Sequence, residues 1–386
     1  MHRRELLQLF GGVAVAGARP FAFQGQARRR IAIAGGGILG ANIAHQLAKR
    51  GASVTLLDRA RPGTGATANS FAWINAKKQP HAYFTLSQMG IEAWHELHAD
   101  IGKELPVRWG GTIEWTNNAD RAARQAETMR RFQAWGYPVH LIDEQQLRAL
   151  EPRVVPGVVA SATHAEIEGS ADPVLATEVI LAHAARAGAK IVYPADVTGL
   201  DMSSGRLRAV KTNTGDIEAD VLVVACGVDT PKVAAMAGLT VQLTRSTGIL
   251  FHTGPRPIAI ERILLTPIGN IKQKPDGRIV TGFDFGPSPE EQATKEQGEL
   301  FLKKMSAILP PLAGASVEKV TLGLRPLPKD SFPIIGFPEG RRDIYITVMH
   351  SGITLGPLVG RLAAMEILDG VHVDPLAPYR LERFKT

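Results

Sequence analysis

Three glycines near residue 35 have the spacing that accommodates the phosphates of a dinucleotide. Gly35, Gly37 and Gly40 form the pattern G-x-G-x-x-G directly after the apolar run of residues 30–34. The first glycine allows a tight turn, the second lets the backbone approach a pyrophosphate, and the third allows a helix to pack closely on a strand. The pattern predicts a dinucleotide site. The alternative is a glycine-rich turn without a ligand.

The elements expected around these glycines agree with that prediction. Residues 41–50 have a helical pattern that ends at Gly51, and residues 53–57 read as a second strand that ends in Asp58. A carboxylate 18 positions after the last glycine can accept hydrogen bonds from both ribose hydroxyls of an adenosine. The motif alone does not separate NAD from FAD.

A small, polar segment follows at residues 63–70, Gly-Thr-Gly-Ala-Thr-Ala-Asn-Ser. Backbone amides in such a segment supply hydrogen-bond donors to a phosphate without burying a charge. We therefore treat this segment as a second part of the cofactor site, with a solvated loop as the alternative.

A guanidinium group comes much later, at Arg325 in the Gly-Leu-Arg-Pro segment of residues 323–326. Its planar fork can form two parallel hydrogen bonds to a carboxylate, whereas a lysine offers a point charge. Arg325 is our candidate for holding a substrate carboxylate. The alternative is an ion pair with an acid inside the protein.

Residues 344–357 read as a strand, a turn and the start of a helix that continues over 358–368. Backbone amides at a helix N-terminus stabilise negative charge. His350 lies in the turn, where it would tune a cofactor, accept a proton or simply pack with a structural hydrogen bond.

In this order, the segments 35–40, 63–70, 323–336 and 344–357 resemble those of the D-amino acid oxidase-like family of FAD-dependent oxidoreductases, which includes glycine and sarcosine oxidases and D-amino acid dehydrogenase relatives. The resemblance covers nearly all of residues 31–370. It implies an α/β fold with a Rossmann-like FAD-binding domain and a discontinuous α+β substrate domain built on an antiparallel sheet. The implied FAD-binding domain comprises 30–75, 160–235 and 323–375, and the substrate domain comprises 76–159 and 236–322.

The resemblance also implies roles for single residues. Residues 63–70 would lie against the flavin and its pyrophosphate, the backbone of Val197 against adenine, and residues 351–355 at the pyrimidine side of the flavin. Asn69 stands where some relatives attach the flavin through a histidine, and the chain has no cysteine where others attach it, so we expect non-covalent FAD. The residues assigned to the cofactor are Gly35, Gly37, Ile38, Leu39, Gly40, Asp58, Arg59, Ala66, Thr67, Asn69, Ser70, Val197, Gly227, Arg325, Ser351, Gly352, Ile353, Thr354 and Leu355.

The implied activity is oxidation of an amine or amino acid to an imine, which water then hydrolyses, with oxygen or a quinone or other electron carrier as acceptor. Glycine, sarcosine, D-amino acids and other secondary amines all stay open as substrates. Tyr83, Arg245, His252 and Lys272 are the candidate pocket residues. One alternative is an FAD-binding electron-transfer or assembly protein without amine turnover, and a weaker one is a nicotinamide dehydrogenase.

Charge and cysteine content argue against a nucleic-acid-binding protein, a disulfide-bonded protein and a metalloprotein. Six arginines and one glutamate give +5 in residues 1–30, which leaves only +2 of the total +7 for residues 31–386, so we expect no nucleic-acid partner. The single cysteine, Cys226, excludes an intrachain disulfide and a multi-cysteine metal site, and we expect it to be a small core residue and the protein to need no metal.

Residues 1–29 have the anatomy of an export signal and linker. Arg3 and Arg4 precede the apolar run 6–18, which is 13 residues long and so too short for a stable membrane span. The paired arginines resemble a twin-arginine signal, which implies the corresponding export machinery and a periplasmic or exported protein. If the signal does not function, the protein would be cytoplasmic.

Overall fold

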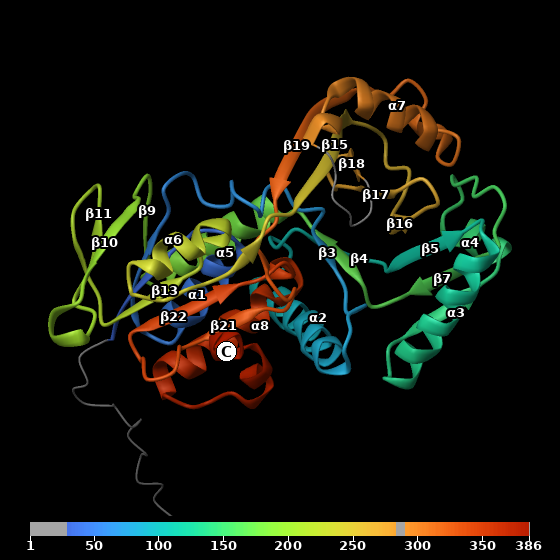
Figure 1. The fold of residues 1–386 in the computed structure, drawn as a ribbon. Coiled ribbons are helices and arrows are strands. Elements are labelled where there is room, and N and C mark those ends of the chain that lie inside the picture. Colours follow the sequence, from blue (N-terminus) through green and yellow to red (C-terminus); the bar gives the residue numbers. More distant parts are fainter. Residues whose placement is uncertain (1–28, 283–289, 386) are drawn as a thin grey trace, which may run out of the picture.

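Two sheets organise the computed structural model, which describes residues 29–282 and 290–385 (Figure 1). The first sheet has six strands, and neighbouring strands are parallel except for the edge pair β21 and β22. Its order is β21 (Ile334–Gly336), β22 (Ile344–Val348), β13 (Val221–Val224), β1 (Arg30–Ala34), β2 (Ser53–Leu57) and β9 (Lys190–Val192).

Strand β1 lies inside this sheet because its side chains are apolar on both faces. Ile31 and Ile33 belong to the core under the helices, whereas Ala32 and Ala34 face a separate core on the other side. The helices over the first face are α1 (Ile38–Lys49), α5 (Pro173–Arg186) and α8 (Gly352–Ala364), with α2 (His81–Ile101) packed on α8. The other face carries α6 (Thr230–Ala235) and the meander β10 (Val197–Asp201), β11 (Ala209–Thr212) and β12 (Ile217–Glu218).

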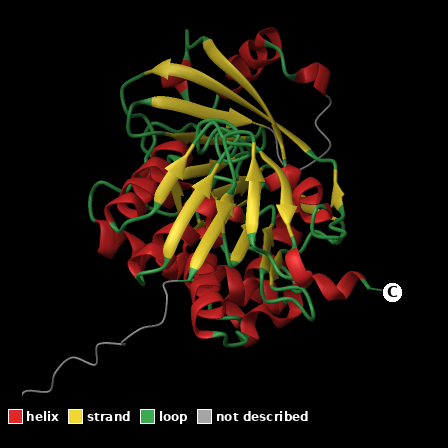
Figure 2. Ribbon diagram, turned by 90° about the vertical axis from the view of Figure 1, so that its left-hand side faces the viewer, coloured by secondary structure: helices red, strands yellow, loops and turns green. Residues whose placement is uncertain are grey.

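The second sheet has eight strands and is antiparallel apart from the parallel pair β16 and β5. In Figure 2 the two groups of strands run in clearly different directions. The order is β19 (Val317–Leu324), β15 (Thr247–Pro255), β18 (Arg278–Gly282), β17 (Asn270–Gln273), β16 (Ile263–Leu265), β5 (Thr112–Thr116), β7 (Ser161–Ala165) and β6 (Val139–Ile142). The mixed α/β fold expected from the sequence, a Rossmann-like sheet with a largely antiparallel second sheet, is therefore confirmed.

Smaller elements complete the two halves. Helix α7 (Lys295–Met305) covers the eight-stranded sheet through Phe301, Leu302 and Met305. The other elements are α3 (Ala119–Ala134), α4 (Glu144–Leu150), the sheet of β3 (Trp73–Ile74), β8 (Gly169–Ala171) and β4 (Val107–Trp109), and the pair β14 (Leu243–Thr244) and β20 (Leu327–Pro328).

Two helices that cover the first sheet, α5 and α8, begin and pack in ways that their residues explain. Helix α5 begins with the Asp172 carboxylate accepting from the Leu175 amide at 3.2 Å and with Pro173 in the first turn, where both residue types favour a helix start. Helix α8 begins at Gly352, within the segment 344–357 that was predicted to hold a helix start, and it contains Pro357. It can approach α1 because a Cβ on Gly360 would lie 2.7 Å from the Asn42 carbonyl oxygen, so only glycine fits there.

The division into two domains stays a prediction, but two elements do not follow the predicted boundaries. Strand β7 (161–165) pairs in the eight-stranded sheet, so a boundary at residue 160 would cut that sheet. Helix α2 packs on α8 of the nucleotide-binding half, although it lies within the range 76–159. The proposed signal lies outside the described residues. None of the helices in the part of the chain that the structure describes is long and apolar enough to cross a membrane.

Candidate functional site

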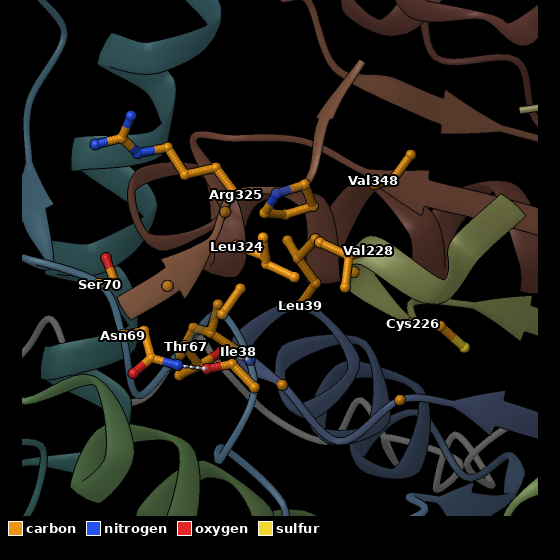
Figure 3. A pocket seen from close by; sticks show the side chains of 18 of the residues that line it. Ile38, Leu39, Thr67, Asn69, Ser70, Cys226, Val228, Leu324, Arg325 and Val348 are labelled. Carbon is orange, nitrogen blue, oxygen red and sulfur yellow. Dashed lines mark hydrogen bonds between the residues drawn. The ribbon is translucent and has the colours of Figure 1, made fainter. Parts of the chain in front are cut away.

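A cavity of about 410 Å³ lies between the two sheets. Its walls come from the turns after β1, β2 and β13, the segment 63–75, the ends of β15, β18 and β19, and the turn before α8 (Figure 3). In open parallel sheets, ligands bind in the crevice outside the carboxyl ends of the strands. The cavity occupies that place.

Most of the predicted site residues line this cavity, although lining alone does not show what they bind. They are Gly35, Gly37, Ile38, Leu39, Asp58, Arg59, Ala66, Thr67, Asn69, Ser70, Val197, Gly227, Arg325, His350, Ser351, Gly352, Ile353 and Thr354.

Two predicted residues do not line the cavity. A Cβ on Gly40 would overlap the Gly35 carbonyl, so this glycine is needed to seat α1 on the turn and not to contact a ligand. Leu355 is fully buried in the core among the helices and does not line the cavity.

The glycine turn is shaped by its backbone. Gly35 has a φ of +105°, which disfavours any other residue, and a Cβ there would overlap the Ala225 carbonyl. Its amide donates to the Leu57 carbonyl at 2.8 Å, which ties the turn to the end of β2. Ile38 and Leu39, the first residues of α1, line the cavity, and a helix N-terminus favours a phosphate.

Asp58 is held at the end of β2 by two amides. Its Oδ2 accepts from the Gly36 amide at 2.7 Å and its Oδ1 from the Ala60 amide at 2.9 Å. Each carboxylate oxygen can accept a second hydrogen bond, so the group can also receive two ribose hydroxyls. Next to it, Arg59 pairs with Asp229 at 2.8 Å.

The segment 63–70 forms the wall beside α1. Thr67 Oγ1 accepts from the Ile38 amide at 3.1 Å, and the two residues lie side by side in Figure 3. Asn69 donates to the Gly65 carbonyl at 3.1 Å, and Ser70 Oγ accepts from the Ala72 amide at 2.9 Å. These bonds fix the loop, which argues against a freely solvated segment.

At the corner after β13, Gly227 has a φ of +57° and lines the cavity with Val197. The Cys226 thiol donates to the Ala34 carbonyl at 3.2 Å, and burial raises its pKa to about 12. A protonated thiol is not a nucleophile, in keeping with the packing role expected for this residue.

A second helix N-terminus meets the cavity at α8. Ser351 precedes the helix, and its hydroxyl forms a 2.6 Å hydrogen bond with Tyr83 of α2. The Thr354 hydroxyl donates to the Trp73 carbonyl at 3.3 Å. The first amides of α8 can therefore stabilise negative charge at this end of the cavity.

Arg325 follows the last residue of β19 at the same end. Its guanidinium donates to Ser246 Oγ at 3.2 Å, and its amide donates to the Ser246 carbonyl at 2.8 Å. A Cβ on Gly248 would lie 2.7 Å from the guanidinium, so the glycine leaves the room that this side chain fills. Burial lowers the pKa of Arg325, yet arginine stays charged in proteins.

His350 lines the cavity between Arg325 and the start of α8. Burial, followed by the charges of Lys78 and Arg325, lowers its pKa to about 4. The imidazole is therefore neutral at pH 7 and a weak base, which favours a role in hydrogen bonding over one in proton uptake.

None of the four residues predicted to line the substrate pocket lines the main cavity. Tyr83 reaches it only through Ser351, and His252 bonds to Thr321 Oγ1 at 3.1 Å within the eight-stranded sheet. Arg245 lines an adjoining hollow that also borders Arg325. Lys272 is buried, with its ammonium on the Ala171 carbonyl at 2.9 Å.

Sequence reasoning missed Lys78, Trp73 and Asn270, which all line the cavity. Lys78 and Trp73 lie in the connection from residue 71 to α2, which has no recognisable motif. Asn270 is the first residue of β17 and belongs to no motif of the sequence.

The residues present fit a dinucleotide with a redox-active ring. The glycine turn, Asp58 and the first amides of α1 suit an adenosine and pyrophosphate, and the amides of α8 suit a ring that becomes negative on reduction. No set of three or more histidine, cysteine or acidic side chains within 29–282 and 290–385 could hold a metal ion.

Comparisons with known proteins agree with this site. The profile of the DAO family, described as FAD dependent oxidoreductase, matches residues 30–365. Glycine oxidase from Geobacillus kaustophilus is 25% identical over 92% of this chain and 97% of its own. The crystal structure of that species' glycine oxidase superimposes with a TM-score of 0.83 at 21% identity, covering 92% of this chain and 98% of the other. L-proline dehydrogenase from P. horikoshii gives 0.82 at 25% identity, covering 92% and 98%. The chain belongs to the DAO family of FAD-dependent oxidoreductases.

Proposed function

We propose that this enzyme oxidises an amino acid at the carbon beside its nitrogen. The observation that carries the proposal is Arg325, whose guanidinium lines the cavity at the α8 end. A partly buried arginine can form two parallel hydrogen bonds to a carboxylate, and these orient the rest of the ligand. Glycine oxidase and L-proline dehydrogenase, which this chain resembles, are named for amino-acid substrates.

The chemistry divides between cofactor and protein. FAD, when bound, accepts the hydride from the substrate carbon. Arg325 holds the carboxylate, and neutral His350 offers a hydrogen bond without adding a further positive charge. The imine that results reacts with water to give a carbonyl compound and ammonia or an amine, so no protein nucleophile is needed.

Anaerobic mixing tests the proposal. Glycine, sarcosine, D- and L-amino acids and alkylamines are added to the purified yellow protein, and the flavin absorbance near 450 nm is followed. We expect bleaching by an amino acid, loss of it in Arg325→Ala, and only partial recovery in Arg325→Lys, because lysine lacks the fork. An alkylamine without a carboxylate is the control that should not depend on Arg325.

Two further readouts complete this experiment. Readmitted oxygen separates an oxidase, which reoxidises rapidly, from a dehydrogenase that needs a carrier. If dithionite reduces the flavin but no amine does, the proposal of amine oxidation fails. The protein is then better described as an FAD-binding electron carrier. We also propose that FAD is non-covalent, so acid denaturation should release all of it into the supernatant.

For the first residues, we propose export by a twin-arginine signal. Support comes from Arg3 and Arg4 followed by the apolar run 6–18. Residues 1–30 fused to a reporter that is active only after export should give activity, and Arg3→Lys with Arg4→Lys should abolish it. Activity that persists in the double variant would overturn this proposal.

A further inference from the structure

We propose that Glu168 is a positioning residue, which holds the indole of Trp73 in place as an aromatic wall at the α8 end of the cavity. In this role Trp73 contacts the bound substrate, and Glu168 acts on it only through the indole. The inference rests on the proposed amino-acid oxidation and adds two residues to it, neither of which belongs to a motif of the sequence.

The backbone of Trp73 lies against the first turn of α8. Trp73 lines the cavity, and its carbonyl accepts a hydrogen bond from the Thr354 hydroxyl at 3.3 Å. Thr354 Oγ1 accepts in turn from the Asn75 amide at 3.3 Å, and Asn75 lines the cavity as well. The main chain of this wall is therefore fixed to the helix N-terminus that borders the cavity.

The ring of Trp73 is fixed from outside the cavity by Glu168. This side chain is fully buried and does not line the cavity. Its Oε2 accepts from Trp73 Nε1 at 2.7 Å, and its Oε1 accepts from the Tyr137 hydroxyl at 2.7 Å. Hydrogen bonds to a carboxylate in a buried place are strong ones, so the bond from Trp73 restricts rotation of the indole.

The two donors explain why an acid stands at this position. Each carboxylate oxygen accepts one of the two bonds, whereas the amide of a glutamine has one oxygen and an NH2 group that cannot accept. Burial raises the pKa of Glu168, and the charge of Lys77 acts against this rise. The Lys77 ammonium lies over the Trp73 ring, 5.7 Å from its centre, and 3.0 Å from Glu114 Oε2. The charge of Glu168 is thus offset by a cation that lies over the same indole.

Tyr137 extends the support to the residues that follow Trp73. Its hydroxyl accepts from the Ala76 amide at 3.2 Å while it donates to Glu168. Burial, followed by the charge of Glu168, raises the pKa of Tyr137 well above its usual value, so the hydroxyl stays protonated and able to donate. One buried carboxylate therefore organises the wall from Trp73 to Lys77.

A ring held in this way acts on whatever occupies the α8 end of the cavity. Contact with a fixed aromatic side chain excludes water and sets the orientation of the occupant. A misplacement of about 1 Å can cost about 100-fold in rate. Loss of the bond between Glu168 and Trp73 should therefore slow flavin reduction, although it removes no group that takes part in the chemistry.

The hydrogen bond itself is tested by nuclear magnetic resonance of the FAD-loaded protein with isotope-labelled indole nitrogens. The chain has five tryptophans, so Trp73→Phe assigns one indole N–H signal among five. Glu168→Gln should move the Trp73 signal upfield, because an amide accepts more weakly than a carboxylate. The indole of Trp115 is buried and donates to the Pro156 carbonyl at 3.2 Å, so its signal should stay in place.

A double-mutant cycle tests the role in the reaction. Glycine, sarcosine, L-proline and both enantiomers of alanine are the probes, and anaerobic flavin reduction gives the rate constant and the dissociation constant. The ratio of these constants should fall about tenfold in Glu168→Gln and in Trp73→Phe. The double variant should equal Trp73→Phe, because Glu168 acts through the indole.

The matched control is Trp115→Phe, which also loses a buried indole hydrogen bond but lies outside the cavity lining. Its ratio should equal that of the wild type. Flavin content and thermal unfolding show whether each variant has folded. If Glu168→Gln does not fold, Trp73→Phe alone decides, since wild-type kinetics in that variant contradict the wall role.

The outcomes separate this proposal from the one on which it rests. An effect of Glu168→Gln that persists in the Trp73→Phe background overturns the positioning role, while amino-acid oxidation stands. If no probe reduces the wild-type flavin, amino-acid oxidation fails. The resonance experiment is independent of turnover, and an unmoved Trp73 signal in Glu168→Gln overturns the positioning role in either case.

Discussion

Lys272 shows how a single buried charge can weaken this fold. Its side chain is 3% exposed, and burial lowers its pKa to about 7. In the unfolded chain the pKa of a lysine is about 10.4. Between pH 7 and this value the unfolded state binds more protons than the folded state, so the free energy of unfolding rises with pH. Below about pH 7 both states are charged and the cost of burial is present in full.

We therefore expect Lys272→Met to unfold a few degrees higher than the wild type at pH 6, with a smaller gain at pH 9. The matched control is Lys274→Met. The Lys274 ammonium lies 2.5 Å from the Asp172 carboxylate, so this substitution leaves a buried carboxylate unpaired and should lower the unfolding temperature. Thermal unfolding of the FAD-loaded proteins followed by circular dichroism measures both. Equal destabilisation of Lys272→Met at the two pH values would show that its hydrogen bond to Ala171 matters more than its charge.

At the same scale, the sequence predicts some site residues and misses others for a physical reason. Gly35 and Asp58 are tied to a local pattern, because the turn and the strand end that need them are neighbours in the chain. Lys78 is not, since its place in the same cavity as His350 depends on packing between segments some 270 positions apart in the chain.

At the scale of elements, helix α8 contains Pro357, although a proline inside a helix normally breaks or kinks it. Proline has no amide hydrogen, so the Ile353 carbonyl lacks its usual partner four residues on. The indole of Trp94 on α2 supplies it, with Nε1 donating to the Ile353 oxygen at 2.8 Å. A contact between distant helices thus makes the proline tolerable, and nothing in the local sequence indicates it.

The hydrogen bond from Trp94 to the Ile353 carbonyl predicts that Trp94→Phe destabilises the wild type more than it destabilises a Pro357→Ala variant. Trp94→Phe should cost about 1–3 kcal/mol in the free energy of unfolding, since it leaves the buried Ile353 carbonyl unsatisfied. In a Pro357→Ala background, where an amide is restored, the cost should fall by about 1 kcal/mol. Urea unfolding of the four proteins gives the coupling energy. Strictly additive effects would mean that Trp94 acts through its volume and not through its hydrogen bond.

At the scale of the whole molecule, the two-sheet architecture was implied by the resemblance of several segments to one family. The apolar run 30–34, the glycine turn and the strand 53–57 predict the start of the parallel sheet locally, whereas the antiparallel sheet was expected only from the resemblance. The assignment of β7 to the second sheet was not predictable in this way, because its partners β5 and β6 are chosen by pairing and not by its own composition.

The cavity couples these sheets, because its lining includes Gly35 from the first and Gly248, Asn270 and Leu324 from the second. FAD should therefore stabilise both, by about 2.7 kcal/mol when free FAD is 100 times its dissociation constant. Hydrogen exchange of the FAD-free protein should show added protection on FAD binding in β1 and β13 and also in β15 and β19. ADP is the control, since it can fill only the adenosine and phosphate part and should protect the six-stranded sheet alone. If FAD and ADP protect the same strands, the two sheets are stabilised separately and the cavity does not link them.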